Sequence, residues 1–185
     1  MDTRNCNWVK TRAIGKGAFG EVHMAIPRPA NMDYSKLLAP IIAVKSAEFK
    51  HSSSLQKEGS IMFTLNDCSG IVRCYGEDVS VESDKKVYNL LLEFAPAGSL
   101  RNLMQRSNKG KLPESDVRRY TRMILNALRH MHERGYAHCD IKPENILVFP
   151  SKNGENSVKI ADFGLAQKTR DNVRSCSPKS DGSHR

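Results

Sequence analysis

The chain has 185 residues, of which 39% are hydrophobic and 26% charged, and it contains only 8 prolines and 12 glycines. This composition excludes collagen-like and low-complexity classes, and the length suits an ordinary core in one domain or two small lobes. The formal net charge of +9 favours anionic partners, namely nucleotide phosphates, nucleic acid or an acidic protein surface, without choosing among them.

The first predicted elements are two strands separated by a glycine-rich turn. Large or apolar residues alternate with charged ones over residues 8–14, and residues 22–26 resume the β-type pattern. Because a strand follows the glycines, the pattern disfavours the dinucleotide-binding fingerprint, which needs a helix at that place. After a loop over residues 27–40, residues 41–45 predict a buried strand that ends on the cation Lys45.

A helix is predicted over residues 52–65, because its apolar residues recur on one helical face and serines at its start are cap candidates. Gly59 in its interior lowers the stability of this helix by about 1 kcal/mol relative to alanine. Two more strands, at residues 71–75 and 87–94, flank a charged turn at residues 82–86. The first part of the chain therefore contains five strands and one helix.

The pattern changes from strands to helices at residues 95–98, where proline and glycine predict a hinge. Ser99 is placed to cap a short helix, and Pro113 opens a long helix that stops at Gly135. Apolar runs on either side of a polar, glycine-containing turn then predict a hairpin of residues 146–149 and 158–161. We divide the chain into a first lobe (8–94), the hinge (95–98), a second lobe (99–167) and a flexible basic tail (168–185).

The glycine-rich turn carries the first chemical signal. Glycines allow backbone N–H groups to approach phosphate oxygens, because side chains at those positions would block the approach. A tight hairpin that binds nothing is an equally good account of this turn taken alone. The residues expected to cradle phosphates here are Gly15, Lys16, Gly17, Ala18, Gly20 and Val22.

Residues 138–145, His-Cys-Asp-Ile-Lys-Pro-Glu-Asn, are the most informative segment of the chain. Asp140 can accept the proton of an attacking hydroxyl, Lys142 can neutralise a moving phosphoryl group, and Asn145 can hold a magnesium ion. Asp162, in Asp-Phe-Gly, is the second expected metal ligand. Each of these side chains taken singly could be an ordinary loop or turn residue; in combination they favour phosphoryl transfer.

Lys45 and Glu58 lie thirteen positions apart, at the end of a predicted strand and within a predicted helix. In isolation each would be read as a solvated surface residue. Together they can form an ion pair that aims the lysine at the α- and β-phosphates of a nucleotide.

These motifs, in this order, resemble those of eukaryotic protein kinases, and Lys142 resembles the serine/threonine branch. The phrases around them are similar to plant MAP kinase kinase kinases of the MEKK-like group. The resemblance implies an α+β, two-lobed fold with a five-stranded antiparallel sheet and one helix in the N-lobe and an incomplete, mainly helical C-lobe. It further implies ATP and Mg²⁺ as cofactors and a protein substrate, namely a downstream MAP kinase kinase.

The resemblance also assigns residues around the adenine base. Leu92 would be the gatekeeper, and Glu93 and Ala95 would offer hinge backbone groups. The residues implied to line the adenine slot are Ile14, Val22 and Ala43, and those implied to stack in the family's hydrophobic spine are Met62, Cys74, His138 and Phe163.

The chain departs from the family pattern at two places. Cys139 replaces the arginine that most kinases carry before the aspartate and that pairs with an activation-loop phosphate, so activation by that route is in doubt. No Ala-Pro-Glu motif follows in the 23 residues after Asp162, which we interpret as C-terminal truncation. The long helix over residues 113–135 is then expected to expose apolar surface.

Two further functions stay open beside the kinase. One is a truncated, catalytically impaired fragment that binds nucleotide or regulates a full-length kinase. The other is a nucleic-acid binder, which the scattered basic residues and the lack of a nucleic-acid motif disfavour, so no nucleic-acid partner is expected.

The five cysteines include no CxxC pair, and their odd number indicates a reducing compartment. Buried thiols explain them better than a zinc site of Cys68, Cys74 and the His138-Cys139 pair. The longest apolar runs are too short to cross a bilayer. We therefore expect a cytoplasmic protein, with the nucleus as a second location, and no membrane partner.

Overall fold

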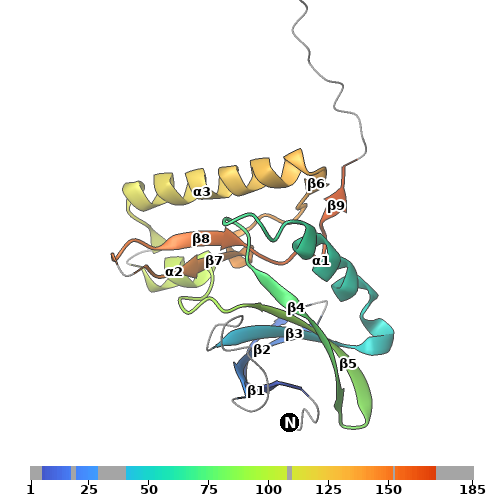
Figure 1. Ribbon diagram of the computed structural model, residues 1–185. Coiled ribbons are helices and arrows are strands. Elements are labelled where there is room, and N and C mark those ends of the chain that lie inside the picture. Colours follow the sequence, from blue (N-terminus) through green and yellow to red (C-terminus); the bar gives the residue numbers. More distant parts are fainter. Residues whose placement is uncertain (1–5, 18–19, 29–40, 108–109, 152, 170–185) are drawn as a thin grey trace, which may run out of the picture.

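The computed structural model describes residues 6–17, 20–28, 41–107, 110–151 and 153–169. The chain forms an N-lobe built on a sheet and a smaller C-lobe built on helices (Figure 1). Within the described residues no helix has both the length and the apolar character needed to span a membrane.

The N-lobe contains the expected five-stranded antiparallel sheet, in the strand order β1-β2-β3-β5-β4. One helix, α1, packs against it, and the short 3₁₀ helix η2 leads into α1. The bounds are β1 (Trp8–Gly17), β2 (Gly20–Pro27), β3 (Ile42–Glu48), η2 (Phe49–His51), α1 (Ser53–Thr64), β4 (Cys74–Glu82) and β5 (Lys85–Glu93).

The strand predicted at residues 71–75 was misplaced, because β4 begins at Cys74 and continues to Glu82. Ile71 instead forms an isolated parallel bridge with Ile160 of the other lobe. The polar residues that follow Cys74 extend the strand because they pair with β5 across a two-residue turn, which is shorter than the charged turn predicted at residues 82–86. Both turn residues, Ser83 and Asp84, have positive φ angles of 48° and 63°, which suits the tight hairpin turns that match strand twist.

Helix α1 differs from expectation at its cap and at its glycine. Ser52 precedes the helix but makes no capping hydrogen bond; its hydroxyl donates to the Phe49 carbonyl and accepts from Gln56. A Cβ on Gly59 would lie 2.9 Å from Leu90 Cδ1, so the glycine allows α1 to pack closely on β5. This packing explains why a glycine occurs at position 59, although glycine is unfavourable inside a helix.

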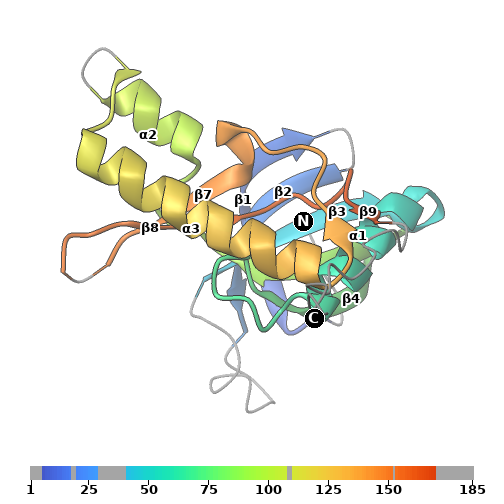
Figure 2. The same cartoon turned by 90° about the horizontal axis from the view of Figure 1, so that it is seen from above.

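The C-lobe holds two helices and a hairpin, and α3 lies along strand β8 (Figures 1 and 2). Ser99 caps α2 as expected, in a reciprocal capping box with Asn102. The bounds are α2 (Leu100–Arg106), α3 (Glu114–Glu133), β6 (Tyr136–Ala137), the 3₁₀ helix η4 (Pro143–Asn145), β7 (Ile146–Phe149), β8 (Ser157–Ile160) and β9 (Gln167–Lys168).

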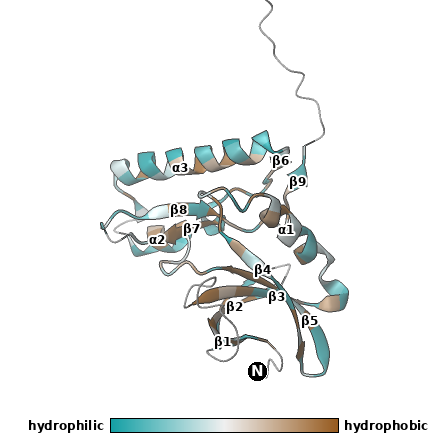
Figure 3. Cartoon of the chain, viewed as in Figure 1, coloured by the Kyte–Doolittle hydropathy of each residue, from teal (hydrophilic) through white to brown (hydrophobic). Residues whose placement is uncertain are grey.

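Helix α3 buries Tyr120, Ala127 and Met131 against the lobe, while Val117 is 48% exposed and Leu125 59% exposed. The side of the helix that faces away from the hairpin is mainly hydrophilic (Figure 3).

The boundary of the predicted tail falls inside a strand. Gln167 and Lys168 form β9, which pairs with β6, and the Thr169 amide donates to the Gly135 carbonyl at 2.8 Å. The rest of the predicted tail, residues 170–185, lies outside the described residues.

Candidate active site

One face of the N-lobe sheet carries the residues expected around a nucleotide. Val22 pairs with Lys45 across β2 and β3, and Ala43 pairs with Leu92 across β3 and β5. Directly opposed residues of an antiparallel pair share a face, so these four side chains lie on one side of the sheet. Ala43 is buried, Val22 and Leu92 are half-buried, and Ile14, near the end of β1, is 43% exposed.

The glycines around this face serve the fold in different ways. Gly20 has a φ of 140°, and a Cβ there would lie 2.2 Å from the Ser46 carbonyl oxygen of β3. Gly20 is therefore required by the sheet itself, whether or not a phosphate approaches. A Cβ on Gly15 would meet Val22 at an ordinary 3.8 Å.

The two ends of the glycine turn meet at the pair Gly17 and Gly20. Lys16 places its ammonium 2.9 Å from the Glu21 carboxylate, and both side chains are largely exposed. Ala18, also expected at the phosphates, lies outside the described residues.

Lys45 occupies the junction between the two lobes. Its ammonium lies 2.9 and 2.7 Å from the two carboxylate oxygens of Glu58 in α1 and 2.9 Å from Asp162 Oδ1 of the C-lobe. The Lys45 and Glu58 side chains are buried, whereas the Asp162 side chain is 40% exposed. The predicted Lys45–Glu58 ion pair is thus present, and Asp162 joins it.

Burial acts to lower the pKa of Lys45, but the charges of Glu58 and Asp162 outweigh it and raise that pKa above its ordinary 10.5. Burial also raises the pKa of Glu58, and the attraction of Lys45 offsets only part of the effect. Lys45 therefore keeps its positive charge at physiological pH. A buried cation fixed from two sides can bind a phosphate oxygen with little loss of side-chain entropy.

The 138–145 segment closes on itself around Asp140. Oδ2 of Asp140 accepts hydrogen bonds from Lys142 Nζ at 2.7 Å and from Asn145 Nδ2 at 2.9 Å. The same amide nitrogen also donates to the Asp140 backbone carbonyl at 2.9 Å. The three residues predicted from their spacing are therefore in direct contact.

The hydrogen bond from Lys142 lowers the pKa of Asp140, and the same bond raises the pKa of Lys142. Asp140 is consequently an ionised acceptor at neutral pH. Both side chains remain accessible to solvent, and thus to a substrate, with 25% and 46% of their surfaces exposed.

His138 is a structural residue, as its sequence context favoured. It is 2% exposed, and its ring packs edge-on against Phe163 with 4.9 Å between centroids. Its Nδ1 faces the Asp140 backbone amide, which can only donate, so Nε2 carries the proton and donates to the Ala161 carbonyl at 3.0 Å. Burial lowers the pKa of His138, which favours this neutral form. The four residues of the expected hydrophobic spine are all buried, namely Met62, Cys74, His138 and Phe163.

Asn145 and Asp162 provide a donor set that suits Mg²⁺. The Asn145 amide nitrogen uses its two hydrogens inside the loop, which leaves Oδ1 as the oxygen that can ligate, and Asp162 contributes a carboxylate. The backbones around them are joined by a hydrogen bond from the Ala161 amide to the Asn145 carbonyl at 2.8 Å. Mg²⁺ is commonly held by one or two such oxygens together with substrate phosphates.

A metal cage made by the protein alone finds no support. The described part of the chain contains no group of three or more His, Cys, Asp or Glu side chains that could hold a metal ion, which argues against the zinc alternative. Cys74 is buried and Cys68 partly buried, as small hydrophobic residues would be, whereas Cys139 is exposed, contrary to that expectation.

The hinge shows a contact that the sequence did not reveal. Lys159 of β8 donates to both carboxylate oxygens of Glu93 at 2.7 Å, and the Arg73 amide donates to the same carboxylate at 3.1 Å. Glu93 and Lys159 are 66 positions apart, and no local pattern marks Lys159. The contact ties the end of β5 to the C-lobe hairpin and so restrains the hinge.

Two hinge backbone groups are already engaged within the protein. The Glu93 amide donates to the Arg73 carbonyl at 2.9 Å, and the Ala95 carbonyl accepts from the Gly98 amide at 3.1 Å. Of the backbone groups of Glu93 and Ala95, these bonds leave the Glu93 carbonyl and the Ala95 amide for adenine.

The family model of the protein kinase domain matches residues 8–182 of this chain. The chain belongs to the protein kinase family. It is 47% identical over 161 residues to mitogen-activated protein kinase kinase kinase 20 of Arabidopsis thaliana, an alignment that covers 87% of this chain and 45% of that protein. It is 36% identical to mitogen-activated protein kinase kinase kinase 17 of the same plant, over 87% of this chain and 40% of that one. The serine/threonine-protein kinase grp of Drosophila melanogaster is 32% identical to this chain, over 88% of this chain and 29% of that protein.

These relatives support a serine/threonine kinase domain of the MAP kinase kinase kinase type. The chain spans less than half the length of each of these curated relatives. Cys139, where most kinases carry an arginine, is exposed and has a φ of 63°.

Proposed function

We propose that this chain contributes the nucleotide site and catalytic loop of a protein kinase that transfers the γ-phosphoryl group of ATP to serine or threonine hydroxyls. The observation that carries the proposal is Lys45, held between Glu58 of the N-lobe and Asp162 of the C-lobe. This arrangement fixes one cation at the junction of the two lobes. A kinase needs that cation at the α- and β-phosphates.

Asp140 is the group proposed to orient the attacking hydroxyl and receive its proton. The side-chain hydrogen bonds from Lys142 and Asn145 both go to Oδ2 of Asp140. Among the described residues, no side chain donates a hydrogen bond to Oδ1. Oδ1 is therefore the oxygen that would face the substrate. Its low basicity suits a late proton transfer, because the phosphoryl transition state is loose and needs little activation of the hydroxyl.

Lys142, next to Asp140, is proposed to neutralise negative charge on the transferred phosphoryl group. Its ammonium lies 2.7 Å from Asp140 Oδ2, so a phosphoryl group that approaches Asp140 also approaches a positive charge. A bound Mg²⁺ would supply further neutralisation of phosphate charge, and Asn145 and Asp162 are the residues that would hold it. The names of these relatives lead us to propose a MAP kinase kinase as the protein substrate.

A transfer assay with radiolabelled ATP and a protein substrate tests this function. We expect incorporation into serine or threonine that disappears in an Asp140→Asn variant with unchanged nucleotide affinity. Activity equal in wild type and Asp140→Asn would contradict the role of Asp140.

The alternative function is nucleotide binding without turnover. The side chains of Lys45, Asn145 and Asp162 support it as well as they support the kinase, because each would contact the nucleotide or its magnesium ion without any proton transfer. Saturable Mg-ATP binding combined with no transfer above the Asp140→Asn level would support this alternative.

A further inference from the structure

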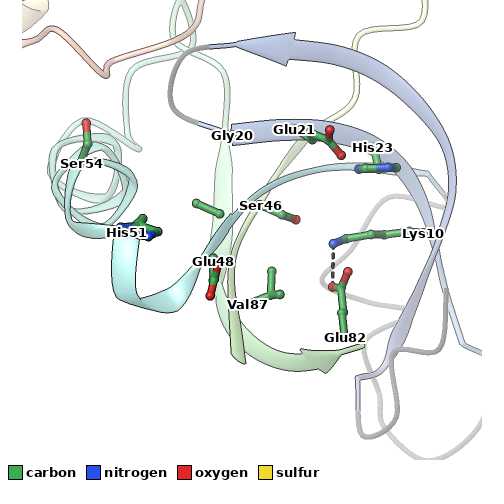
Figure 4. A pocket seen from close by; sticks show the side chains of 11 residues that line it. Lys10, Gly20, Glu21, His23, Ser46, Glu48, His51, Ser54, Glu82 and Val87 are labelled. Atoms are coloured by element: carbon green, nitrogen blue, oxygen red, sulfur yellow. Dashed lines mark hydrogen bonds and ion pairs between the residues drawn. The ribbon is translucent and has the colours of Figure 1, made fainter. Parts of the chain in front are cut away.

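A cavity of about 430 Å³ lies on the opposite face of the N-lobe sheet from Lys45. Successive side chains of a strand alternate between faces, so Ser46 and Glu48 of β3 point away from the nucleotide face. Figure 4 shows Lys10 and Glu82 on one side of this hollow and His51 and Ser54 on the other, with Ser46, Glu48 and Val87 between them.

Part of the cavity wall is polar, buried and held in place. Lys10, His23 and Ser46 are only 8%, 6% and 8% exposed. Lys10 donates to Glu82 at 2.6 Å, and a chain of hydrogen bonds continues from Glu82 through Ser80 and Asn89 to Ser46. A ligand would therefore meet preorganised groups on this wall, which lowers the entropy cost of binding.

His23 is the group in this wall whose hydrogen bonding is incomplete. Its side chain lines the cavity, and its Nδ1 is buried without a hydrogen-bond partner among the described residues. Buried polar atoms nearly always have a partner, and exceptions mark a missing water, ion or ligand. In the tautomer with the proton on Nε2, Nδ1 would accept a hydrogen bond from a ligand that donates one.

The charge of the lining is acidic, although the whole chain is basic. Three glutamates, Glu21, Glu48 and Glu82, line the cavity with a single lysine, Lys10, which Glu82 already neutralises. Glu21 is paired with Lys16 at 2.9 Å, and Glu48 is paired with Lys50 at 3.0 Å and with Lys85 at 3.8 Å.

The side chains of these three lysines are 80%, 64% and 64% exposed and do not line the cavity. Exposed ion pairs contribute little, so an incoming cation can replace them.

We propose that this cavity binds the arginine side chain of a basic peptide segment. A guanidinium carries five N–H donors in a rigid plane, sheds water more readily than an ammonium, and can bridge acceptors on two walls. Here those acceptors are the carboxylates of Glu21 and Glu48 and the imidazole of His23. The net charge of +9 of the whole chain opposes the approach of a cation, so the carboxylates of the cavity must supply the attraction locally.

The test is a titration of the full chain with a ten-residue glycine-serine peptide that contains two arginines, followed by NMR of the histidine imidazole signals. We expect saturable shifts at His23 and His51, which line the cavity, and none at His132 on α3. A matched peptide with citrulline, the neutral analogue of arginine, is expected to give no shifts. The double variant Glu21→Gln/Glu48→Gln is expected to bind about tenfold more weakly.

The control is Glu114→Gln, which removes an exposed carboxylate of α3 outside the cavity and should leave the affinity unchanged. Glu21 and Glu48 have exposed or partly exposed side chains, so the double variant should retain the wild-type fold, which its unfolding midpoint checks. Absence of shifts at both cavity histidines with millimolar peptide would overturn the proposal. Equal weakening by Glu114→Gln, or equal binding of the citrulline peptide, would overturn it as well. None of these outcomes bears on Mg-ATP binding at the other face.

Discussion

The two faces of the N-lobe sheet each bury a lysine, and they neutralise its charge in different ways. On the outer face Lys10 has one carboxylate, Glu82, which belongs to the same lobe and to a chain of hydrogen bonds that ends at Ser46. On the inner face Lys45 has two, and one of them, Asp162, belongs to the other lobe and is 40% exposed. The first lysine belongs to a hydrogen-bonded network within one lobe, whereas the second links the two lobes and is the group proposed to bind a phosphate.

The largest effect is expected from breaking the outer pair. Lys10→Met leaves Glu82 with only 14% of its side chain exposed and no cation, which should lower the free energy of unfolding by about 3 kcal/mol. Urea denaturation measures this change. As the matched control, Lys16→Met removes an exposed pair with Glu21 and should cost less than about 1 kcal/mol. Similar losses in the two variants would show that the outer pair contributes no more than a surface pair.

A second, smaller loss is expected at Gly20. An alanine there would place its Cβ 2.2 Å from the Ser46 carbonyl in a backbone conformation with φ of 140°, so the sheet must shift, at a cost of about 2 kcal/mol. Gly15→Ala, whose Cβ meets only Val22 at 3.8 Å, is the control and should change stability by about 0.5 kcal/mol or less. If Gly20→Ala unfolds at the wild-type urea concentration, close packing against β3 is not the reason for this glycine.

On the inner face, Lys45→Met should destabilise the protein by about 1 kcal/mol, less than Lys10→Met does. Glu58, whose pKa burial already raises, can take up a proton, and the partly exposed Asp162 can be hydrated. Urea denaturation of both variants side by side measures the difference. A loss equal to or greater than that of Lys10→Met would show that the inner pair is chiefly structural.

The smallest effect concerns His138 and pH. Because its folded pKa lies below the ordinary 6.5, the unfolded chain binds the extra proton first, and stability should fall as pH drops below about 6.5. His138→Gln should flatten this dependence, whereas His132→Gln on the exposed side of α3 should not. Unfolding free energies at pH 5.5 and 7.5 check the slope; the same slope in wild type and His138→Gln would exclude a neutral buried imidazole.

Much of this architecture could be predicted because its signals are local. Pro113 followed by acidic residues predicted the start of α3, and Ser99 predicted the cap of α2. The charged residues predicted a turn between β4 and β5. The start of β4 was misplaced because Ile71 and Val72 look like strand residues but pair with Ile160 of the other lobe. The pattern of neighbouring residues does not show which distant segment an apolar residue will pair with.

The contacts of the candidate site likewise fall into local ones, which could be predicted, and long-range ones, which could not. The contacts of Asp140 with Lys142 and Asn145 follow from spacing within a single loop, and the Lys45–Glu58 pair from a strand and the next helix. Asp162 joins Lys45 across 117 positions, and Lys159 reaches Glu93 across 66. Those contacts depend on how the lobes pack, which no short segment encodes.

The most direct test of the central claim is the thermal unfolding midpoint with and without Mg-ATP, for wild type, Lys45→Met and Lys10→Met. A ligand at about 100 times its dissociation constant stabilises the native state by about 2.7 kcal/mol. We predict a clear rise in midpoint for wild type, a similar rise for Lys10→Met from a lower starting point, and a much smaller one for Lys45→Met. No rise in wild type, or an equal rise in Lys45→Met, would contradict the claim that Lys45, held between the two lobes, forms a nucleotide site.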